Sequence, residues 1–321
     1  MKPRIIIAAI FAGLCLSAAA QAQYPTKPIR LVVPYPPGGP TDFVGRAVAA
    51  KLTEYLGQQM VVDNRPGAGT VIASEIIARA APDGYNLLFG TGGGTFLAPL
   101  ILPKVPYDPQ KDYASVAMLV MSPQVLVVHP ALGANSVKEL IAVAKAKPGQ
   151  LNFSSVGTGT SPHLGGELFK SLAGIDLVHV PYKGSPQYVI DLLAARIDLS
   201  IGAAGPVLPH AKAGRLRLLG VSAAKRDPAI PDVPAISEAV PGFEVVGWYG
   251  LLTTAGTPAP VVRKLHAEAV RILALPDVKS VYANAGMDAV SSGSPAEFDA
   301  LIRNERDKWA KVIKGAGIRI E

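Results

Sequence analysis

The sequence predicts an α/β protein built from two domains, with mostly parallel strands. Strand-like and helix-like segments alternate from Ile29 to about Ala223, which is typical of parallel strands joined by crossover helices. The chain of 321 residues is long for a single hydrophobic core. A strand, a glycine-rich turn and a helix follow one another near the start of each half. Two such turns facing each other across a cleft would present two helix N-termini to one ligand.

The first of these units is Leu31–Leu56. Its short apolar strand leads into the turn Pro36–Pro40, and Thr41 and Asp42 stand where a helix N-cap is expected. An apolar stripe for burial then recurs at every fourth residue: Val44, Val48, Leu52 and Leu56. Free N–H groups and the positive end of the helix dipole would meet at the turn, which makes an anion site without a charged side chain. The alternative is a plain strand–helix turn that binds nothing.

The remainder of the first half repeats strands and glycine turns. Strands are expected at Met60–Val62 and Tyr85–Phe89, followed by the glycine turns Asn64–Gly69 (with a helix through Arg79) and Gly90–Thr95. Pro103–Tyr113 is too rich in proline for a regular helix or a central strand. The apolar segment Val116–His129 is expected to cross into the second half.

The second half begins with a helix that Ser136 caps and that runs through Lys147, and with the strand Leu151–Ser155. The turn Val156–Pro162 then repeats the first unit, with Ser161 as the expected N-cap and Pro162 at the first helical position. The helix after it is expected to bury Leu164, Leu168 and Leu172.

The chain then continues in shorter elements. Strands are expected at Leu177–Val180, Asp198–Ile201 and Leu216–Ser222, with turns at Pro181–Gly184 and Gly202–Gly205 and a helix through Ala195. A connector punctuated by proline, Ala229–Gly242, precedes the apolar run Phe243–Thr254, which is long enough to return to the first domain. Two amphipathic helices, at about Pro260–Ala274 and Pro295–Ile313, complete the expected fold.

An export signal precedes the expected fold. Lys2 and Arg4 are followed by the apolar run Ile5–Ala20, and the small residues around Gln21 predict cleavage after Ala22. Cys15 is the only cysteine, so the mature chain would form no disulfide. An exported protein without disulfides fits a bacterial periplasm.

Charge and motifs exclude several functions. The 31 basic and 24 acidic residues are scattered, without the basic block of a nucleic-acid-binding protein. The turn at Gly157 lacks the third glycine of a dinucleotide site, and the sequence has no Walker loop, G-x-S-x-G elbow or H-E-x-x-H zinc motif. We therefore expect a monomeric binding protein without metal or cofactor, rather than an enzyme.

Three side chains near the turns have alternative roles. His163 lies in the first turn after the second glycine loop, where a local structural role is favoured over ligand contact. Asp42 is either an N-cap or an acceptor for a ligand's ammonium or hydroxyl group. Lys183, in a turn after a strand, is either a cation near the cleft or a surface lysine.

A series of motifs runs through the chain in a fixed order. They are VPYPPGGPTD (33–42), NRPGAG (64–69), PDGY (82–85), PYDPQKD (106–112), GTGTSPH (157–163), VPYKG (180–184) and WYG (248–250). This succession resembles the Bug-type extracytoplasmic solute receptors, which are the substrate-binding proteins of tripartite tricarboxylate transporters. The resemblance covers essentially the whole mature chain.

The resemblance implies a type II periplasmic-binding-protein-like fold, in which two α/β domains joined by crossing strands close on a ligand in the cleft between them. Residues 1–22 would form the signal peptide, 23–125 and 243–321 the first domain, and 126–242 the second. Backbone amides, hydroxyls and waters of the facing turns would hold a carboxylate. The implied ligand-binding residues are Tyr35, Gly38, Gly39, Thr41, Asp42, Thr91, Gly92, Gly157, Thr158, Thr160, Ser161, His163, Lys183, Gly184 and Ala203.

The resemblance also implies a function. The protein would capture a small organic acid, such as a di- or tricarboxylate, an amino acid or an aromatic carboxylate, and deliver it to membrane transporter subunits. A ligand sensor that docks on a signalling partner is one alternative, and a secreted hydrolase built on Ser161, His163 and Asp42 is another. The third turn, Gly92–Phe96, is richer in glycine than in many relatives, so the contacts of the distal half of the ligand stay undefined.

Overall fold

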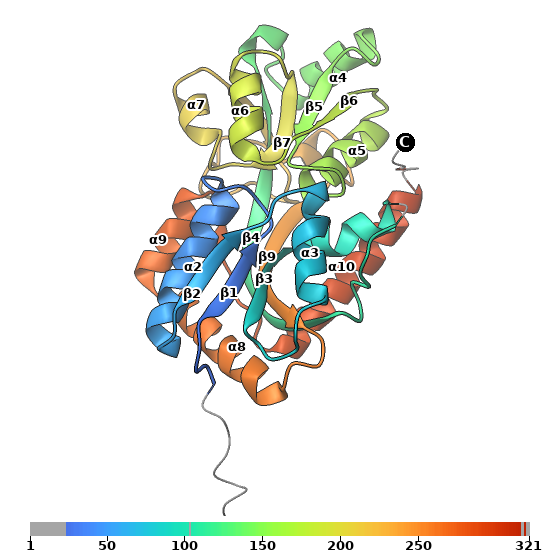
Figure 1. Cartoon of the computed structure of the whole chain (residues 1–321). Helices are drawn as coiled ribbons and strands as arrows, with labels where there is room; N and C mark the ends of the chain where they lie inside the picture. The colour runs from blue at the N-terminus through green and yellow to red at the C-terminus, as the bar shows by residue number, and fades with distance from the viewer. Residues whose placement is uncertain (1–23, 103, 316–317, 319–321) are drawn as a thin grey trace, which may run out of the picture.

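The computed structural model describes residues 24–102, 104–315 and 318. The predicted signal peptide and its cleavage site after Ala22 lie outside these residues. Figure 1 shows the chain as two halves, with strands β4 and β9 running between them.

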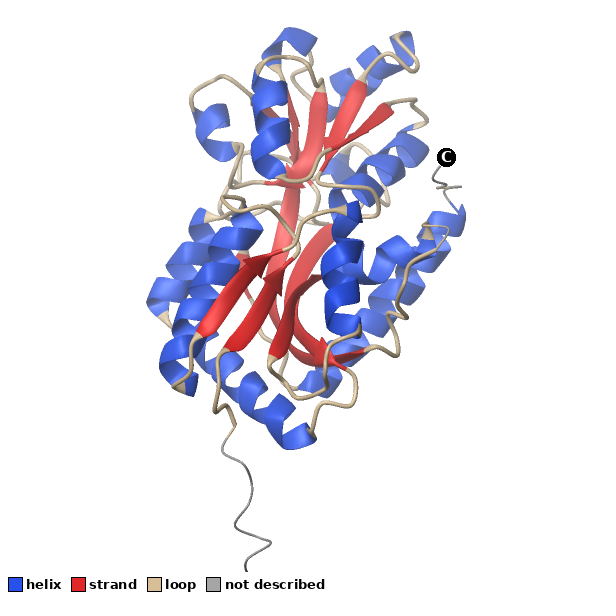
Figure 2. Cartoon of the chain, in the orientation of Figure 1, coloured by secondary structure: helices blue, strands red, loops and turns tan. Residues whose placement is uncertain are grey.

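The first half is built on three parallel strands. β1 (Ile29–Val33) lies between β2 (Met60–Asn64) and β3 (Asn86–Thr91) and pairs with both in parallel. Helices α2 (Pro40–Leu56) and α3 (Val71–Ala78) connect these strands. Helices cover the sheet (Figure 2), so the inner strands β1 and β3 are mostly buried apolar runs, whereas the edge strand β2 is only partly buried.

The second half repeats this plan. Strand β5 (Asn152–Ser155) pairs in parallel with β6 (Val178–Pro181) and β7 (Leu199–Ala203). The helices of this half are α4 (Val137–Ala146), α5 (Ser161–Ala173), α6 (Ser185–Leu193) and α7 (Leu208–Lys212), and strand β8 (Arg217–Val221) follows them. The predicted alternation of strands and helices is therefore confirmed in both halves.

Two long strands join the halves. The first part of β4 (Tyr113–Val128) is antiparallel to β9 (Val246–Thr254), with pairs from Tyr113 to Pro123. From Gln124 onward β4 pairs with β7 instead, and from Val125 also with β8. The main strand order is β2-β1-β3-β9-β4-β7-β5-β6. The two crossing segments predicted from the sequence are these strands.

The chain ends in helices that pack back on the fold. They are α8 (Ala259–Leu273), α9 (Pro276–Asn284) and α10 (Pro295–Gly315), with the short strand β10 (Asp288–Ala289) before α10. The sequence analysis missed α9. Phe298 near the start of α10 belongs to a hydrophobic cluster of the first half, whereas Trp309 and Ile313 join the cluster of the second half that contains Phe169. The predicted domain boundaries at residues 125 and 242 stay predictions.

Three local expectations were wrong. The N-cap of α2 is Gly39, not Thr41 or Asp42, because Pro40 already occupies the first helical position. The N-cap of α5 is Thr160, so Ser161 is the first helical residue and Pro162 the second. Leu172 is 43% exposed and Phe169 is buried in its place, whereas the stripe of α2 is buried throughout.

The glycine turn predicted at Gly90–Thr95 is helical rather than a simple turn. Residues Gly92–Leu97 form one π-helical turn, and the Thr91 hydroxyl caps it by accepting a hydrogen bond from the N–H of Gly94 at 3.2 Å. Short 3₁₀ turns occupy Ala68–Thr70, Ala98–Leu100, Pro130–Leu132 and Ile236–Glu238.

Candidate functional site

Three helix N-termini converge on one small cavity between the halves. Gly39 to Thr41 at the start of α2, Ser161 and Pro162 at the start of α5, and Gly184 to Pro186 at the start of α6 all line it. The first N–H groups of a helix have no intrahelical partner and carry its positive dipole end. The sequence predicted two of these termini, and the structure adds the third from α6.

The wall of this central cavity carries no charged side chain. Its lining residues include the hydroxyl groups of Tyr35, Thr41, Thr91, Ser122, Ser161, Ser185 and Tyr249, the amide of Gln124 and the indole of Trp248. Burial raises the pKa of Tyr35 and of Tyr249, so both phenols stay protonated and can donate hydrogen bonds. The accessible volume is about 40 Å³, room for a few water molecules. The cavity therefore provides neutral hydrogen-bond donors and helix dipoles that an anion could contact, without a positively charged side chain.

Asp42 is occupied by its neighbours within the first half. Its carboxylate accepts hydrogen bonds from the Gly38 N–H at 3.0 Å, from Arg46 at 3.0 Å and from the Asn64 side chain at 2.8 Å. Burial alone would raise the pKa of Asp42, but these three hydrogen bonds outweigh it and hold the pKa below its usual value. Asp42 therefore fixes the turn at Gly38 and does not line the central cavity.

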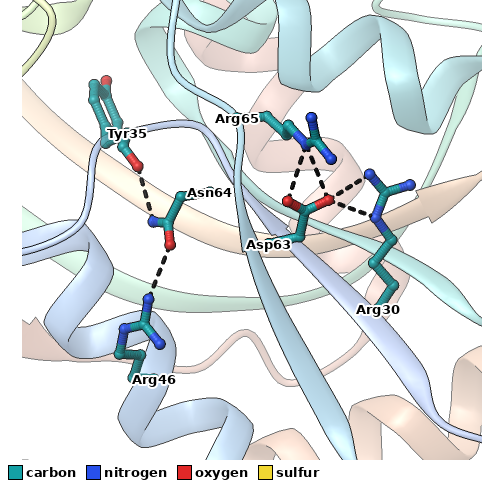
Figure 3. Close-up of polar contacts among 6 residues, drawn as sticks. All are labelled: Arg30, Tyr35, Arg46, Asp63, Asn64 and Arg65. Atoms are coloured by element: carbon teal, nitrogen blue, oxygen red, sulfur yellow. Dashed lines mark hydrogen bonds and ion pairs between the residues drawn. The ribbon is translucent and has the colours of Figure 1, made fainter.

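Asn64 at the end of β2 completes this support. Its side-chain N–H donates to the backbone carbonyl of Tyr35 at 2.9 Å, and its oxygen accepts from Arg46 at 2.9 Å (Figure 3). The adjacent Asp63 is bonded to Arg30 and Arg65 on the other side of the strand. The NRPGAG motif thus begins with a residue that holds the turn between β1 and α2.

The glycine turn Val156–Pro162 is held from behind by a buried pair of histidines. His163 is 4% exposed, and its Nδ1 accepts a hydrogen bond from the Gly159 N–H at 3.1 Å. Its ring lies 4.1 Å, between centroids, from the ring of His179. Nε2 of His179 is 2.7 Å from the hydroxyl of Ser155, which in turn accepts from the Gly157 N–H at 3.1 Å. Both histidines thus bond to the loop backbone, directly or through Ser155.

Neutral imidazoles are needed for this arrangement. Burial lowers the pKa of His163 to about 3, with further contributions from the nearby His179 and Lys170. Burial also lowers the pKa of His179 to about 4, and Lys170 adds to the effect. A protonated His163 would lose the Nδ1 lone pair that accepts from Gly159.

The glycine turns of the two halves touch through their backbones. A Cβ atom at Gly69 would lie 2.0 Å from the carbonyl oxygen of Thr158, and one at Gly93 would lie 2.3 Å from the backbone nitrogen of Ser161. A Cβ atom at Gly159 would lie 2.5 Å from that of Ala98. Side chains at these glycines would hold the halves apart, which explains the glycine at position 93 of the third turn.

A second, larger cavity lies beside the first. Tyr35 and Val156 line both, and the side cavity, of about 460 Å³, is also lined by Gly67 to Val71, Gly157, Thr158, Lys104 and Lys183. The predicted cation Lys183 therefore lies outside the central cavity, and its side chain is exposed.

The predicted site residues separate into groups. Those that line the central cavity are Tyr35, Gly39, Thr41, Thr91, Ser161, Gly184 and Ala203. Gly157, Thr158 and Lys183 line only the side cavity, and Gly38 and Asp42 line an outer groove beside α2. Gly92, Thr160 and His163 lie behind the turns, where Gly92 packs on the Trp248 ring and the Thr160 hydroxyl donates to the Gly157 carbonyl at 2.6 Å.

Sequence reasoning missed the contribution of the crossing strands. Ser122 and Gln124 of β4 and Gly247, Trp248 and Tyr249 of β9 line the central cavity. The available signal was the position of both strands between the halves, together with the WYG motif. Trp248 is fixed from outside, because its indole N–H donates to Glu305 on α10.

The described residues do not form the machinery of a hydrolase. His163 accepts from the Gly159 N–H, and Asp42 bonds Gly38, Arg46 and Asn64. Within the described part of the chain, no group of three or more His, Cys, Asp and Glu residues could hold a metal ion, and no helix is long and apolar enough to cross a membrane.

The histidine pair makes stability depend on pH. In the unfolded chain a histidine takes up a proton near pH 6.5, whereas the folded pair resists protonation down to about pH 4 for His179 and about pH 3 for His163. The unfolded state therefore binds more protons below pH 6.5, and the melting temperature should fall progressively toward pH 4.

His163→Asn should reduce the dependence of the melting temperature on pH. The asparagine oxygen keeps an acceptor near the Nδ1 position and does not titrate. Melting curves from pH 7.5 to pH 4 for wild type, His163→Asn and the control His210→Asn measure the difference. If the melting temperatures of wild type and His163→Asn fell equally with pH, His163 would not be a source of the pH dependence.

The chain matches known proteins along nearly its whole length. Residues 44–318 match the family model described as tripartite tricarboxylate transporter family receptor. A UPF0065 protein encoded in the tcbD-tcbE intergenic region of Pseudomonas sp. (strain P51) is 38% identical over 313 residues, which is 95% of this chain and 93% of that protein. Protein BugT of Bordetella pertussis is 34% identical over 312 residues, covering 97% and 95%.

Solved structures share the fold closely. R. palustris Rpa4515 with adipate is 35% identical, with a TM-score of 0.87 and coverage of 92% of this chain and 99% of that one. The periplasmic binding protein BugD is 31% identical (TM-score 0.86, coverage 93% and 100%). MatC (Rpa3494) from Rhodopseudomonas palustris with bound malate is also 31% identical (TM-score 0.85, coverage 90% and 100%).

These matches confirm the resemblance read from the motifs and the expected type of fold. The family and its structural neighbours are substrate-binding receptors, so the hydrolase alternative is set aside. The chain belongs to the family of tripartite tricarboxylate transporter receptors, among the Bug-type solute-binding proteins.

Proposed function

We propose that this receptor captures a small carboxylate in the central cavity and delivers it to a tripartite tricarboxylate-type membrane transporter. The observation that carries the proposal is the convergence of three helix N-termini on a cavity without charged side chains. Related receptors were solved with adipate and with malate, and both ligands present carboxylates. We further propose that the chain acts as a monomer in the periplasm after cleavage behind Ala22.

The energetics of capture follow from this geometry. A carboxylate that enters the cavity loses its hydration water. Preorganised N–H and O–H donors take the place of that water, and their hydrogen bonds are stronger because the local dielectric constant is low. Helix N-termini attract the anion without a full counter-charge, so binding stays reversible. A buried lysine or arginine would itself require a partner when the cavity is empty.

We propose that capture involves closure of the halves on the ligand. The turns touch across the cleft at glycine residues, so their close approach is possible only because these positions lack a side chain. A ligand stabilises a closed state only by binding it more tightly than the open one. Donors from α2 on one half and from α5 and α6 on the other supply that difference.

A thermal-shift screen tests the ligand class. Carboxylic acids, including malate, adipate, citrate, glutamate and benzoate, should include at least one that raises the melting temperature by several degrees. A ligand at 100 times its Kd stabilises by about 2.7 kcal/mol. Uncharged amides of the same acids are the matched controls, and a flat response to every acid would count against the proposal.

Gly39→Val tests the first turn. Gly39 has an extended backbone (φ −85°, ψ 167°), and a Cβ atom there would meet only Pro186 at 3.8 Å and the carbonyl of Pro36 at 3.9 Å. The variant should fold with a nearly unchanged melting temperature, whereas its isopropyl group obstructs the anion site. We expect Kd to rise at least about tenfold, or 1.4 kcal/mol, with a smaller rise for Gly39→Ala. Unchanged binding by the folded valine variant would exclude this turn from the site.

Gly93→Ala tests closure. The added methyl group would lie 2.3 Å from the Ser161 nitrogen of the other half, closer than a non-bonded contact allows. We expect weaker acid binding and a radius of gyration that saturating ligand no longer reduces, measured by small-angle X-ray scattering. Gly315→Ala is the control, because nothing lies within 4 Å of its Cβ position. Wild-type affinity and compaction in Gly93→Ala would contradict the closure mechanism.

A further inference from the structure

Gln124 stands at the point where β4 changes its partners. Pro123 is the last residue paired with β9, and Gln124 is the first paired with β7, opposite Ala203. Side chains at alternate positions of a strand share a face, so Gln124 and Ser122 lie on one side of β4, and both line the central cavity. The small side chain of Ala203, its cross-strand neighbour, leaves room beside the amide.

The backbone of Gln124 is fixed in place. Its N–H donates to the hydroxyl of Ser222 at 2.8 Å, and its carbonyl accepts from the N–H of Ser222 at 2.8 Å. Ser222 is fully buried, and its hydroxyl donates in turn to the carbonyl of Val245. These bonds fix the direction in which the Cα–Cβ bond of Gln124 leaves the strand.

The two ends of the amide have different surroundings. Nε2 lies 3.7 Å from the position of a Cβ atom at Gly247, and the Ser161 hydroxyl lies 3.8 Å from the same point. Oε1 faces the other way, toward the Gly165 backbone of α5 among the methyl groups of Ile201 and Val245. Gln124 is only 3% exposed, and Oε1 has no hydrogen-bond partner among the described residues.

An unpaired buried carbonyl lowers stability, so its presence needs an explanation. A methionine of similar shape would fill the same space without that cost. We therefore look for the role of the Gln124 amide at its nitrogen end, which can donate a hydrogen bond. Nε2 is a neutral donor that lies, like the Ser161 hydroxyl, beside Gly247 in the cavity wall, where the proposed function places an anion.

We propose that Gln124 is a ligand-binding residue, which donates a hydrogen bond from Nε2 to a carboxylate oxygen next to the Ser161 hydroxyl. The inference rests on the proposed function and assigns part of the anion site to the crossing strand. Ser122 and Gly247, a register pair of β4 and β9, complete this side of the cavity. A carboxylate held there would contact both halves and the strands that join them.

A ligand-binding role and a structural role predict opposite effects on the empty protein. If the amide served packing, its removal would lower the melting temperature. If it serves the ligand, Gln124→Met removes an unpaired oxygen, so the ligand-free melting temperature stays equal or rises while affinity falls. Such an exchange of stability for function is typical of binding sites.

The test measures both quantities on the purified mature protein. Wild type, Gln124→Met, Gln124→Glu and the control Gln150→Met, at an exposed glutamine, are titrated calorimetrically with malate, adipate, citrate, glutamate and benzoate. For the acids that wild type binds, Gln124→Met should raise Kd about tenfold, the effect of one lost hydrogen bond. Gln124→Glu should weaken binding further by repelling the anion, and Gln150→Met should match wild type.

Each outcome decides between the possibilities. Weaker binding with an equal or higher ligand-free melting temperature in Gln124→Met supports the assignment. A lower melting temperature with unchanged Kd overturns it and makes Gln124 a packing residue. Binding of all acids by Gln124→Met with wild-type affinity also overturns it, while the carboxylate proposal survives. Failure of wild type itself to bind any acid removes the carboxylate proposal, and this inference with it.

Discussion

The site depends on the direct approach of backbone to backbone between the two halves. Gly69 packs on the carbonyl of Thr158, and Gly93 packs on the nitrogen of Ser161, at distances that no side chain permits. Because the turns meet so closely, the N-termini of α2, α5 and α6 share one small cavity. Gly93 of the glycine-rich turn Gly90–Thr95 therefore contributes to the fit between the halves.

Charge is kept at a distance from this cavity. Asp42 is bonded to Arg46 and Asn64 on the far side of the first turn, and Lys183 is exposed beside the side cavity. The histidines behind the second turn have lowered pKa values and stay neutral at neutral pH. What remains inside are dipoles and hydroxyls, which bind an anion without creating a buried charge in the empty receptor. Under the proposed function, such a site would select for the carboxylate group itself and leave the choice among acids to cavity shape.

Local patterns in the sequence predicted much of this structure. The apolar stripe of α2, the alternation of strands and helices and the two crossing segments were all visible as periodicity, and the motifs identified the family. The caps lie earlier than expected, because α2 already begins at Pro40 and α5 begins at Ser161, one residue before Pro162. Gln124 and Gly247 could not be predicted as lining residues, because their orientation depends on the register between β4, β7 and β9. Register is a long-range property that neither spacing nor composition encodes.

The C-terminal helix supports the cavity wall from outside. Phe298 and Ile302 of α10 pack in a cluster of the first half, and Trp309 and Ile313 join the cluster that contains Leu97 and Phe169. Between them Glu305 accepts a hydrogen bond from Trp248 of the cavity wall, and burial raises the pKa of Glu305 to about 8. Because β4 pairs with β9 in the first half and with β7 and β8 in the second, the proposed closure would bend the chain at these strands. Trp248 lies on β9 opposite Met121 of β4, so the bond to Glu305 holds this part of the cavity wall against α10.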